Sequence, residues 1–109
     1  MARRRSKRKI VRIEVEIVSA DKSYSGFIEN ISNSGIYLET PSIDPLSSST
    51  RFIPGNEFEL KFTALSGAEI RMECRVVWSY KTPPQGLSKK VGLTIINPSD
   101  RYLEFYNNQ

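Results

Sequence analysis

The sequence of 109 residues contains no histidine and only one cysteine, Cys74. Histidine is the commonest general base and metal ligand, and it activates most serine and cysteine nucleophiles. A single cysteine excludes an internal disulfide and a thiolate zinc cluster. No apolar run approaches the roughly 18–20 residues of a membrane-spanning helix. These absences favour a binding module over an enzyme, with no catalytic residue, no metal and no membrane insertion expected.

Composition and terminal sequence narrow the class further. A mass of 12.4 kDa with 39% hydrophobic and 26% charged residues fits one domain with one modest core. No Walker loop, G-x-G-x-x-G or G-x-S-x-G motif is present. The N-terminus is basic, but no apolar segment of the kind found in a secretory signal follows it. We therefore expect a cytoplasmic protein.

Positive charge is concentrated at the N-terminus. The formal net charge is +4, yet residues 1–12 contain seven basic residues and no acidic one, so the other 97 residues sum to −3. A segment this basic repels itself and attracts phosphate groups or an anionic surface. It is either a solubilising tail or an anion clamp that becomes ordered when its ligand binds.

Most of the chain alternates between apolar and polar residues with a period of two, which is typical of half-buried strands. Residues rich in Gly, Pro, Ser and Asn separate the alternating segments. Six short strands joined in sequence favour an antiparallel barrel or a closely packed sandwich. The segments predicted to form strands are Val11–Ile17, Ser23–Ile31, Ile36–Glu39, Glu57–Phe62, Glu69–Trp78 and Val91–Ile95.

The last residues change character. Ser99 or Asn97 is predicted to cap a short helix that carries Leu103 and Tyr106 on one face. The segment Pro41–Gly55 is predicted to be a long loop. We thus divide the chain into a flexible basic arm, residues 1–9, and a barrel domain, residues 10–109.

Several reactive or aromatic residues have a simple structural interpretation. Cys74 lies on the apolar side of a predicted strand, so we expect a buried, unreactive thiol. Glutamates of the fourth and fifth predicted strands alternate with core residues, which is typical of a solvated sheet face rather than an acid/base pair. Trp78 and Phe105 have the rings to stack on a nucleobase, but a small barrel needs large side chains for its core.

Two short motifs stand out from this background. The first is R-x-x-x-R, formed by Arg4 and Arg8 immediately before the first predicted strand. The second is N-x-S-x-x-G, formed by Asn30, Ser32 and Gly35 between the second and third. Each alone is weak, because basic segments repeat the first by chance and ordinary turns contain the second. Their combination in this order is much more specific.

The two motifs resemble those of the PilZ domain family, which are bacterial receptors for the second messenger cyclic di-GMP. The family pattern is R-x-x-x-R followed by [D/N]-x-S-x-x-G, and all fixed positions match. The resemblance extends through Gly35–Leu38, Pro54–Gly55, Val76–Trp78 and Gly92–Leu93, although Ile95 replaces a frequent phenylalanine. It implies a six-stranded antiparallel β-barrel, in an all-β fold, with a short C-terminal helix and a flexible basic N-terminal arm.

The resemblance also implies a role for each motif residue in binding cyclic di-GMP. Arg4 and Arg8 would clamp the ligand, since a guanidinium forks onto phosphate or onto guanine O6 and N7 and stacks on purines. Asn30 and Ser32 offer hydrogen-bonding groups to the guanine edge. Gly35 leaves room for the backbone to turn closely beneath the ligand.

Two further arginines adjoin Arg4, one just before the motif and one within it. By resemblance, Arg3 would favour an intercalated ligand dimer over a single ligand. Arg5 either substitutes for a neighbour or stays solvated. Stoichiometry therefore stays open, and no cofactor other than the ligand is expected.

The predicted mechanism is a switch in which ligand binding orders the arm and changes what a downstream protein partner contacts. The identity of that partner and the cellular output stay open. One alternative is a protein-interaction adaptor that keeps the fold but binds no nucleotide. A nucleic-acid binder could use the same basic arm, but the acidic body lacks a basic stripe with interleaved aromatic residues.

Overall fold

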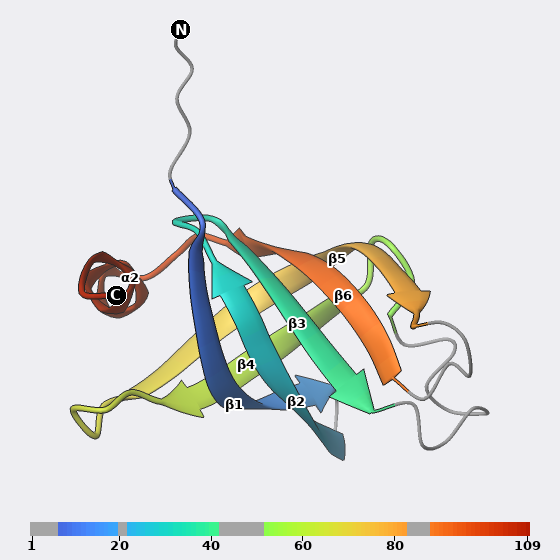
Figure 1. Ribbon diagram of the computed structural model, residues 1–109, viewed down its shortest axis with the longest axis horizontal. Coiled ribbons are helices and arrows are strands. Elements are labelled where there is room, and N and C mark those ends of the chain that lie inside the picture. Colours follow the sequence, from blue (N-terminus) through green and yellow to red (C-terminus); the bar gives the residue numbers. More distant parts are fainter. Residues whose placement is uncertain (1–6, 20–21, 42–51, 83–87) are drawn as a thin grey trace, which may run out of the picture.

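The computed structural model describes residues 7–19, 22–41, 52–82 and 88–109. These residues form a closed antiparallel barrel with the strand order β1-β2-β3-β6-β5-β4, followed by one helix (Figure 1). The predicted six-stranded barrel with a short C-terminal helix is confirmed. The elements are β1 (Lys9–Ser19), β2 (Lys22–Ile31), β3 (Gly35–Pro41), β4 (Glu57–Thr63), β5 (Glu69–Lys81), β6 (Ser88–Ile96) and α2 (Asp100–Asn107).

The basic arm falls mostly outside this description. Residues 1–6 and the central part of the predicted long loop, residues 42–51, lie outside the described residues. β1 begins at Lys9, two residues before the strand predicted from alternation, because pairing with β2 extends to Lys9 opposite Ile31. Lys7 and Arg8 are described and precede the strand directly.

The apolar side chains of the alternating strands fill the inside of the barrel. Ile28, Leu60 and Val91 are fully buried there. In β4, the charged residues that alternate with the buried ones along the strand face outward. Burying each such apolar side chain contributes about 1.5–3 kcal/mol. The core is Val15, Ile17, Ile28, Ile31, Ile36, Leu38, Phe52, Phe58, Leu60, Phe62, Ile70, Met72, Cys74, Val76, Val91, Leu93, Ile95, Tyr102 and Tyr106.

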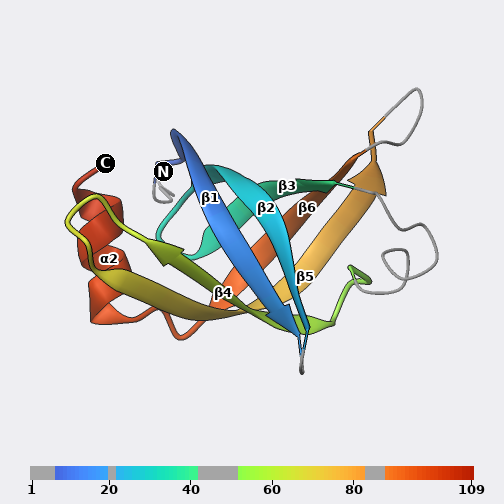
Figure 2. The same cartoon turned by 90° about the horizontal axis from the view of Figure 1, so that it is seen from below.

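Helix α2 lies beside the end of the β4–β5 hairpin (Figure 2). Ser99 is its N-cap, as one of the two predicted candidates, and its Oγ accepts a hydrogen bond from the amide of Tyr102 at 3.1 Å. The buried face differs from the prediction. It consists of Tyr102 and Tyr106, while Leu103 is only half-buried, because the helix turns its tyrosines toward the barrel.

Cys74 faces the core from β5 and is fully buried, as predicted. Burial, together with the neighbouring Glu73 carboxylate, raises the pKa of its thiol to about 12. Because the thiolate is the reactive form, the folded protein holds this cysteine in an inert state.

We therefore expect Cys74 of the folded chain to react with Ellman's reagent at pH 8 roughly a thousandfold more slowly than in urea, since both the thiolate population and access are reduced. Absorbance at the reagent's thiolate band measures the rate. The urea-unfolded chain is the control and should react promptly. Rapid labelling under native conditions, with unchanged circular dichroism, would contradict the buried placement.

Candidate functional site

Arg8 and Asn30 meet where β1 begins and β2 ends. The guanidinium Nη1 of Arg8 donates a hydrogen bond of 2.8 Å to Oδ1 of Asn30, across 22 residues of sequence. The antiparallel register brings them together, since Ile10 lies opposite Asn30. The last residue of the first motif and the first residue of the second are thus in direct contact.

Tyr37 of β3 forms the neighbouring wall. The guanidinium carbon of Arg8 lies 3.9 Å from the centre of the Tyr37 ring, within the range of a cation–π contact. Tyr37 faces outward because Ile36 and Leu38 on either side are buried in the core. The sequence analysis did not assign this residue. Its position two residues after Gly35 on an alternating strand was the available signal.

Ser32 and Gly35 shape the turn between β2 and β3. The amide of Ser32 donates to the carbonyl of Gly35 at 2.9 Å, and the amide of Ser34 donates to Ser32 Oγ at 3.3 Å. Ser32 is buried, so its hydroxyl serves the turn. Gly35 does not have a positive φ; a Cβ there would instead lie 2.8 Å from Nη2 of Arg8. Space for the guanidinium is the reason for glycine at this position.

A β-bulge in β2 brings Asn30 to the outer surface. The register shifts between Ile28 and Asn30, so that Glu29 and Asn30 both lie between two fully buried residues, Ile28 and Ile31. Strict alternation would direct either Asn30 or Ile31 to the wrong face. The extra residue therefore lets the strand keep its core contacts and still present the amide to Arg8.

A second bulge, in β5, moves Trp78 to the outer face. The register shifts between Val76 and Trp78, and the indole then lies across Gly92, where a Cβ would be 2.3 Å from the ring. Trp78 packs edge-on against Tyr37 at 5.1 Å and stacks with Tyr80 at 5.7 Å. The expectation that the core needs this ring is wrong: Trp78 belongs to an outer aromatic row with Tyr37 and Tyr80.

Phe105 behaves as the core interpretation expected. It packs from α2 against Phe62 of β4, with ring centres 5.1 Å apart. It therefore forms part of the contact between helix and barrel rather than of the aromatic row.

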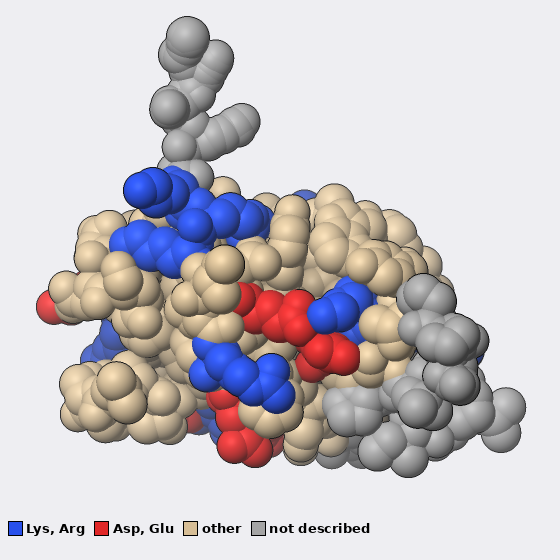
Figure 3. Space-filling model, in the orientation of Figure 1, with Lys and Arg blue, Asp and Glu red and all other residues tan. Residues whose placement is uncertain are grey.

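The charges around the site have defined partners. Lys90 binds Glu29 at 2.7 Å and Glu39 at 3.4 Å. Its hydrogen bond to Glu29 raises the pKa of Lys90, and a hydrogen bond from Ser88 lowers that of Glu39. Basic side chains gather above these residues, where β1 begins (Figure 3). Lys90 offsets one of the two carboxylate charges, and the basic side chains where β1 begins make the region around Arg8 favourable for an anion.

The comparisons with known proteins agree with this geometry. The sequence model of the PilZ domain matches residues 2–106. The chain belongs to the PilZ domain family. A search of curated proteins finds no match.

Solved PilZ proteins share its fold at low identity. The inhibitor of motility MotI/DgrA from Bacillus subtilis aligns with a TM-score of 0.76 and 17% identity, over 99% of this chain and 50% of that one. The PilZ domain of YcgR from Escherichia coli, with c-di-GMP, gives 0.71 and 12%, over 97% and 87%. The MrkH–c-di-GMP complex from K. pneumonia gives 0.66 and 17%, over 99% and 51%. The chain thus spans about half the length of MotI/DgrA and MrkH.

Within this PilZ domain, the predicted site residues divide into two groups. Arg8, Asn30, Ser32 and Gly35 lie together at one end of the barrel. Arg3, Arg4 and Arg5 lie outside the described residues. Among the described residues, no cluster of acidic or cysteine side chains has the composition of a metal site, and no helix is long and apolar enough to cross a membrane.

Helix α2 of the PilZ domain contacts both motif segments. The hydroxyl of Tyr102 donates to the carbonyl of Ser32 at 2.5 Å, and that of Tyr106 donates to the carbonyl of Lys7. Lys9 Nζ donates in turn to the carbonyls of Tyr106 and Gln109, at 2.9 and 3.2 Å. Burial raises the pKa of Tyr102, which keeps its phenol protonated as a donor.

Replacing Tyr102 by phenylalanine should lower the free energy of unfolding by about 1–3 kcal/mol, because the buried Ser32 carbonyl loses its side-chain donor. Urea denaturation followed by circular dichroism measures the change. Tyr80→Phe is the matched control, since Tyr80 is exposed on the outer face, and it should be nearly neutral. Equal stability of the two variants would show that the hydrogen bond from Tyr102 to Ser32 does not stabilise the fold.

Proposed function

We propose that this PilZ domain is a receptor for cyclic di-GMP and that it works by binding rather than catalysis. The observation that carries the proposal is the convergence of Arg8, Asn30 and Gly35 at one end of the barrel. The solved structures of the YcgR PilZ domain and of MrkH contain this ligand and support the proposal.

The hydrogen bond between Arg8 and Asn30 leaves complementary groups available. Arg8 occupies Oδ1 of Asn30, so the amide N–H groups of Asn30 remain to donate to guanine O6 or N7. The remaining guanidinium N–H groups of Arg8 suit a phosphate oxygen. The indole of Trp78, which lies on the outer surface beside Tyr37, offers a ring face on which a purine base can stack.

The arm supplies the second arginine of the clamp in this proposal. Arg4 would bind the ligand from the opposite side to Arg8, with Arg3 and Arg5 adding positive charge. Bringing the ligand's phosphates to this segment offsets the repulsion among its basic residues. The arm then closes over the barrel end and presents a changed surface to a downstream protein partner.

Calorimetric titration of the intact chain with cyclic di-GMP should show saturable binding at micromolar affinity or tighter, with no heat from GTP or cyclic AMP. Arg8→Ala and Arg4→Ala should each weaken binding by about 2–5 kcal/mol, since each removes a paired charge. Ser32→Ala should weaken binding by about 1–2 kcal/mol, because it removes the neutral hydrogen bond from the Ser34 amide that holds the turn.

Arg71→Ala is the matched control for the arginine variants. Arg71 is half exposed on β5 and pairs with Glu59 and Glu69, so its loss should leave the affinity unchanged. If the folded wild-type chain bound no cyclic di-GMP, the receptor proposal would fail and the adaptor alternative would replace it.

Gly35→Ala tests the packing of Arg8 directly. The added methyl group would lie 2.8 Å from Nη2 and displace the guanidinium, so cyclic di-GMP should bind more weakly while the unfolding free energy changes little. The same substitution in an Arg8→Ala background should have a much smaller effect on affinity, because the free-energy changes from substituting two residues in contact do not add. Equal losses in both backgrounds would show that Gly35 acts independently of Arg8.

A further inference from the structure

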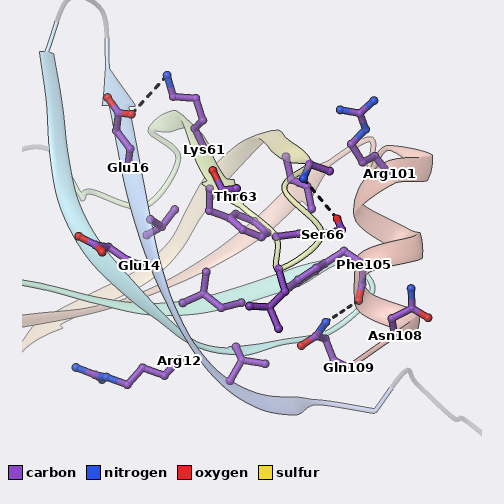
Figure 4. A pocket seen from close by; sticks show the side chains of 18 of the residues that line it. Arg12, Glu14, Glu16, Lys61, Thr63, Ser66, Arg101, Phe105, Asn108 and Gln109 are labelled. Carbon is purple, nitrogen blue, oxygen red and sulfur yellow. Dashed lines mark hydrogen bonds and ion pairs between the residues drawn. The ribbon is translucent and has the colours of Figure 1, made fainter.

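A second hollow lies away from the residues assigned to the ligand. It is a groove of about 1220 Å³ between β1, the β4–β5 hairpin and α2 (Figure 4). None of Arg8, Asn30, Ser32, Gly35 or Tyr37 lines it. A volume of this size exceeds what packing defects in a small domain produce.

The groove exists because β1 and β4 pair over only part of their lengths. Their ladder joins Glu16–Val18 to Glu59–Lys61 and stops there. Residues 9–15 of β1 pair with β2 on one side and with no strand of the described chain on the other. The register between β1 and β2 shifts between Ile10 and Ile13, which marks a bulge in this part of the strand. The result is a free strand edge of about 20 Å.

The floor of the groove is apolar. Val11 and Ile13 of β1 are half-buried along it, and Phe62 of β4 and Phe105 of α2 contribute their rings. In Figure 4, Phe105 points from the helix into the groove. Leu65, in the β4–β5 turn that lines the groove, is fully exposed. An occupant with apolar side chains would bury these surfaces.

The outer face of the free edge carries one charge of each sign. Arg12 and Glu14 are exposed and point away from the groove (Figure 4). The Arg12 guanidinium lies 4.2 Å from the centre of the Phe27 ring, and Glu14 has no ion pair with any described residue. Glu16, next along, is already paired with Lys61 at 3.4 Å. Along its outer face, the edge thus presents a positive charge at Arg12 and a negative charge two residues later, at Glu14.

We propose that this edge is a docking surface for an extended peptide segment of a partner protein, which adds to β1 as an antiparallel strand. Its apolar side chains would face the groove, with an acidic residue opposite Arg12 and a basic residue opposite Glu14. A polypeptide is the occupant because its backbone pairs with the edge amides and carbonyls of β1, which an acyl chain cannot do. The inference does not depend on cyclic di-GMP.

The probe is a fluorescein-labelled peptide, Thr-Val-Lys-Val-Glu-Val-Thr, whose charges match the edge in antiparallel register. Its control is the charge-exchanged peptide, Thr-Val-Glu-Val-Lys-Val-Thr. Fluorescence anisotropy with the full chain should show the first binding at least about fivefold more tightly, as expected from two cross-strand charge pairs. The double variant Arg12→Glu/Glu14→Arg should reverse this preference.

Two further measurements test the position of the peptide. Amide hydrogen exchange between Val11 and Val15 should slow when the first peptide is bound, because strand addition protects edge amides. Leu65→Ser should weaken binding of the peptide. Val77→Ser is its matched control, since Val77 is an exposed residue of β5 that does not line the groove, and it should have no effect.

The proposal would be overturned if the two peptides bound with equal affinity, or if neither bound to the folded chain at concentrations up to about 1 mM. It would also be overturned if bound peptide slowed amide exchange only outside the segment between Val11 and Val15. Binding of dodecanoate in place of both peptides would assign the groove to an apolar ligand instead. A concentration-dependent dimer in sedimentation that Arg12→Glu abolishes would assign the edge to a second copy of the chain.

Discussion

The barrel closes through a seam of only three residue pairs, Glu16 to Val18 of β1 with Lys61 to Glu59 of β4. Beyond this seam, β1 is held on one side by β2 and at its start by α2, which contacts Lys7 and Lys9. The helix therefore anchors the start of β1, which no described strand neighbours on that side. Both the placement of Arg8 and the opening of the groove follow from this limited pairing.

Helix α2 connects the two motif segments physically. One buried tyrosine hydroxyl binds the turn at Ser32, and another binds the chain just before Arg8. Because both contacts come from one short helix, the turn and the arm are positioned relative to each other by a rigid element. The hydrogen bond between Arg8 and Asn30 is then formed between groups whose backbones are already held in place.

Alternation and capping signals were sufficient to locate the strands and the buried Cys74 and to reduce the helix cap to two candidates, Asn97 and Ser99, because these depend on neighbours in sequence. The same signals failed at the bulges. A single extra residue at Glu29 or Val77 changes which face the following residues occupy. A search for strict alternation cannot detect such an insertion. The outward position of Trp78 was therefore missed.

The sequence by itself determined the six strands through their periodicity and, through the spacing of two motifs, the resemblance to the family, since periodicity and spacing are local properties that need no coordinates. Only the tertiary structure decided that Tyr37 lies against Arg8 and packs on Trp78, that Gly35 makes room for a guanidinium, and that β1 keeps a free edge. These features depend on strand register and on where pairing ends, which are set by packing among segments distant in the chain.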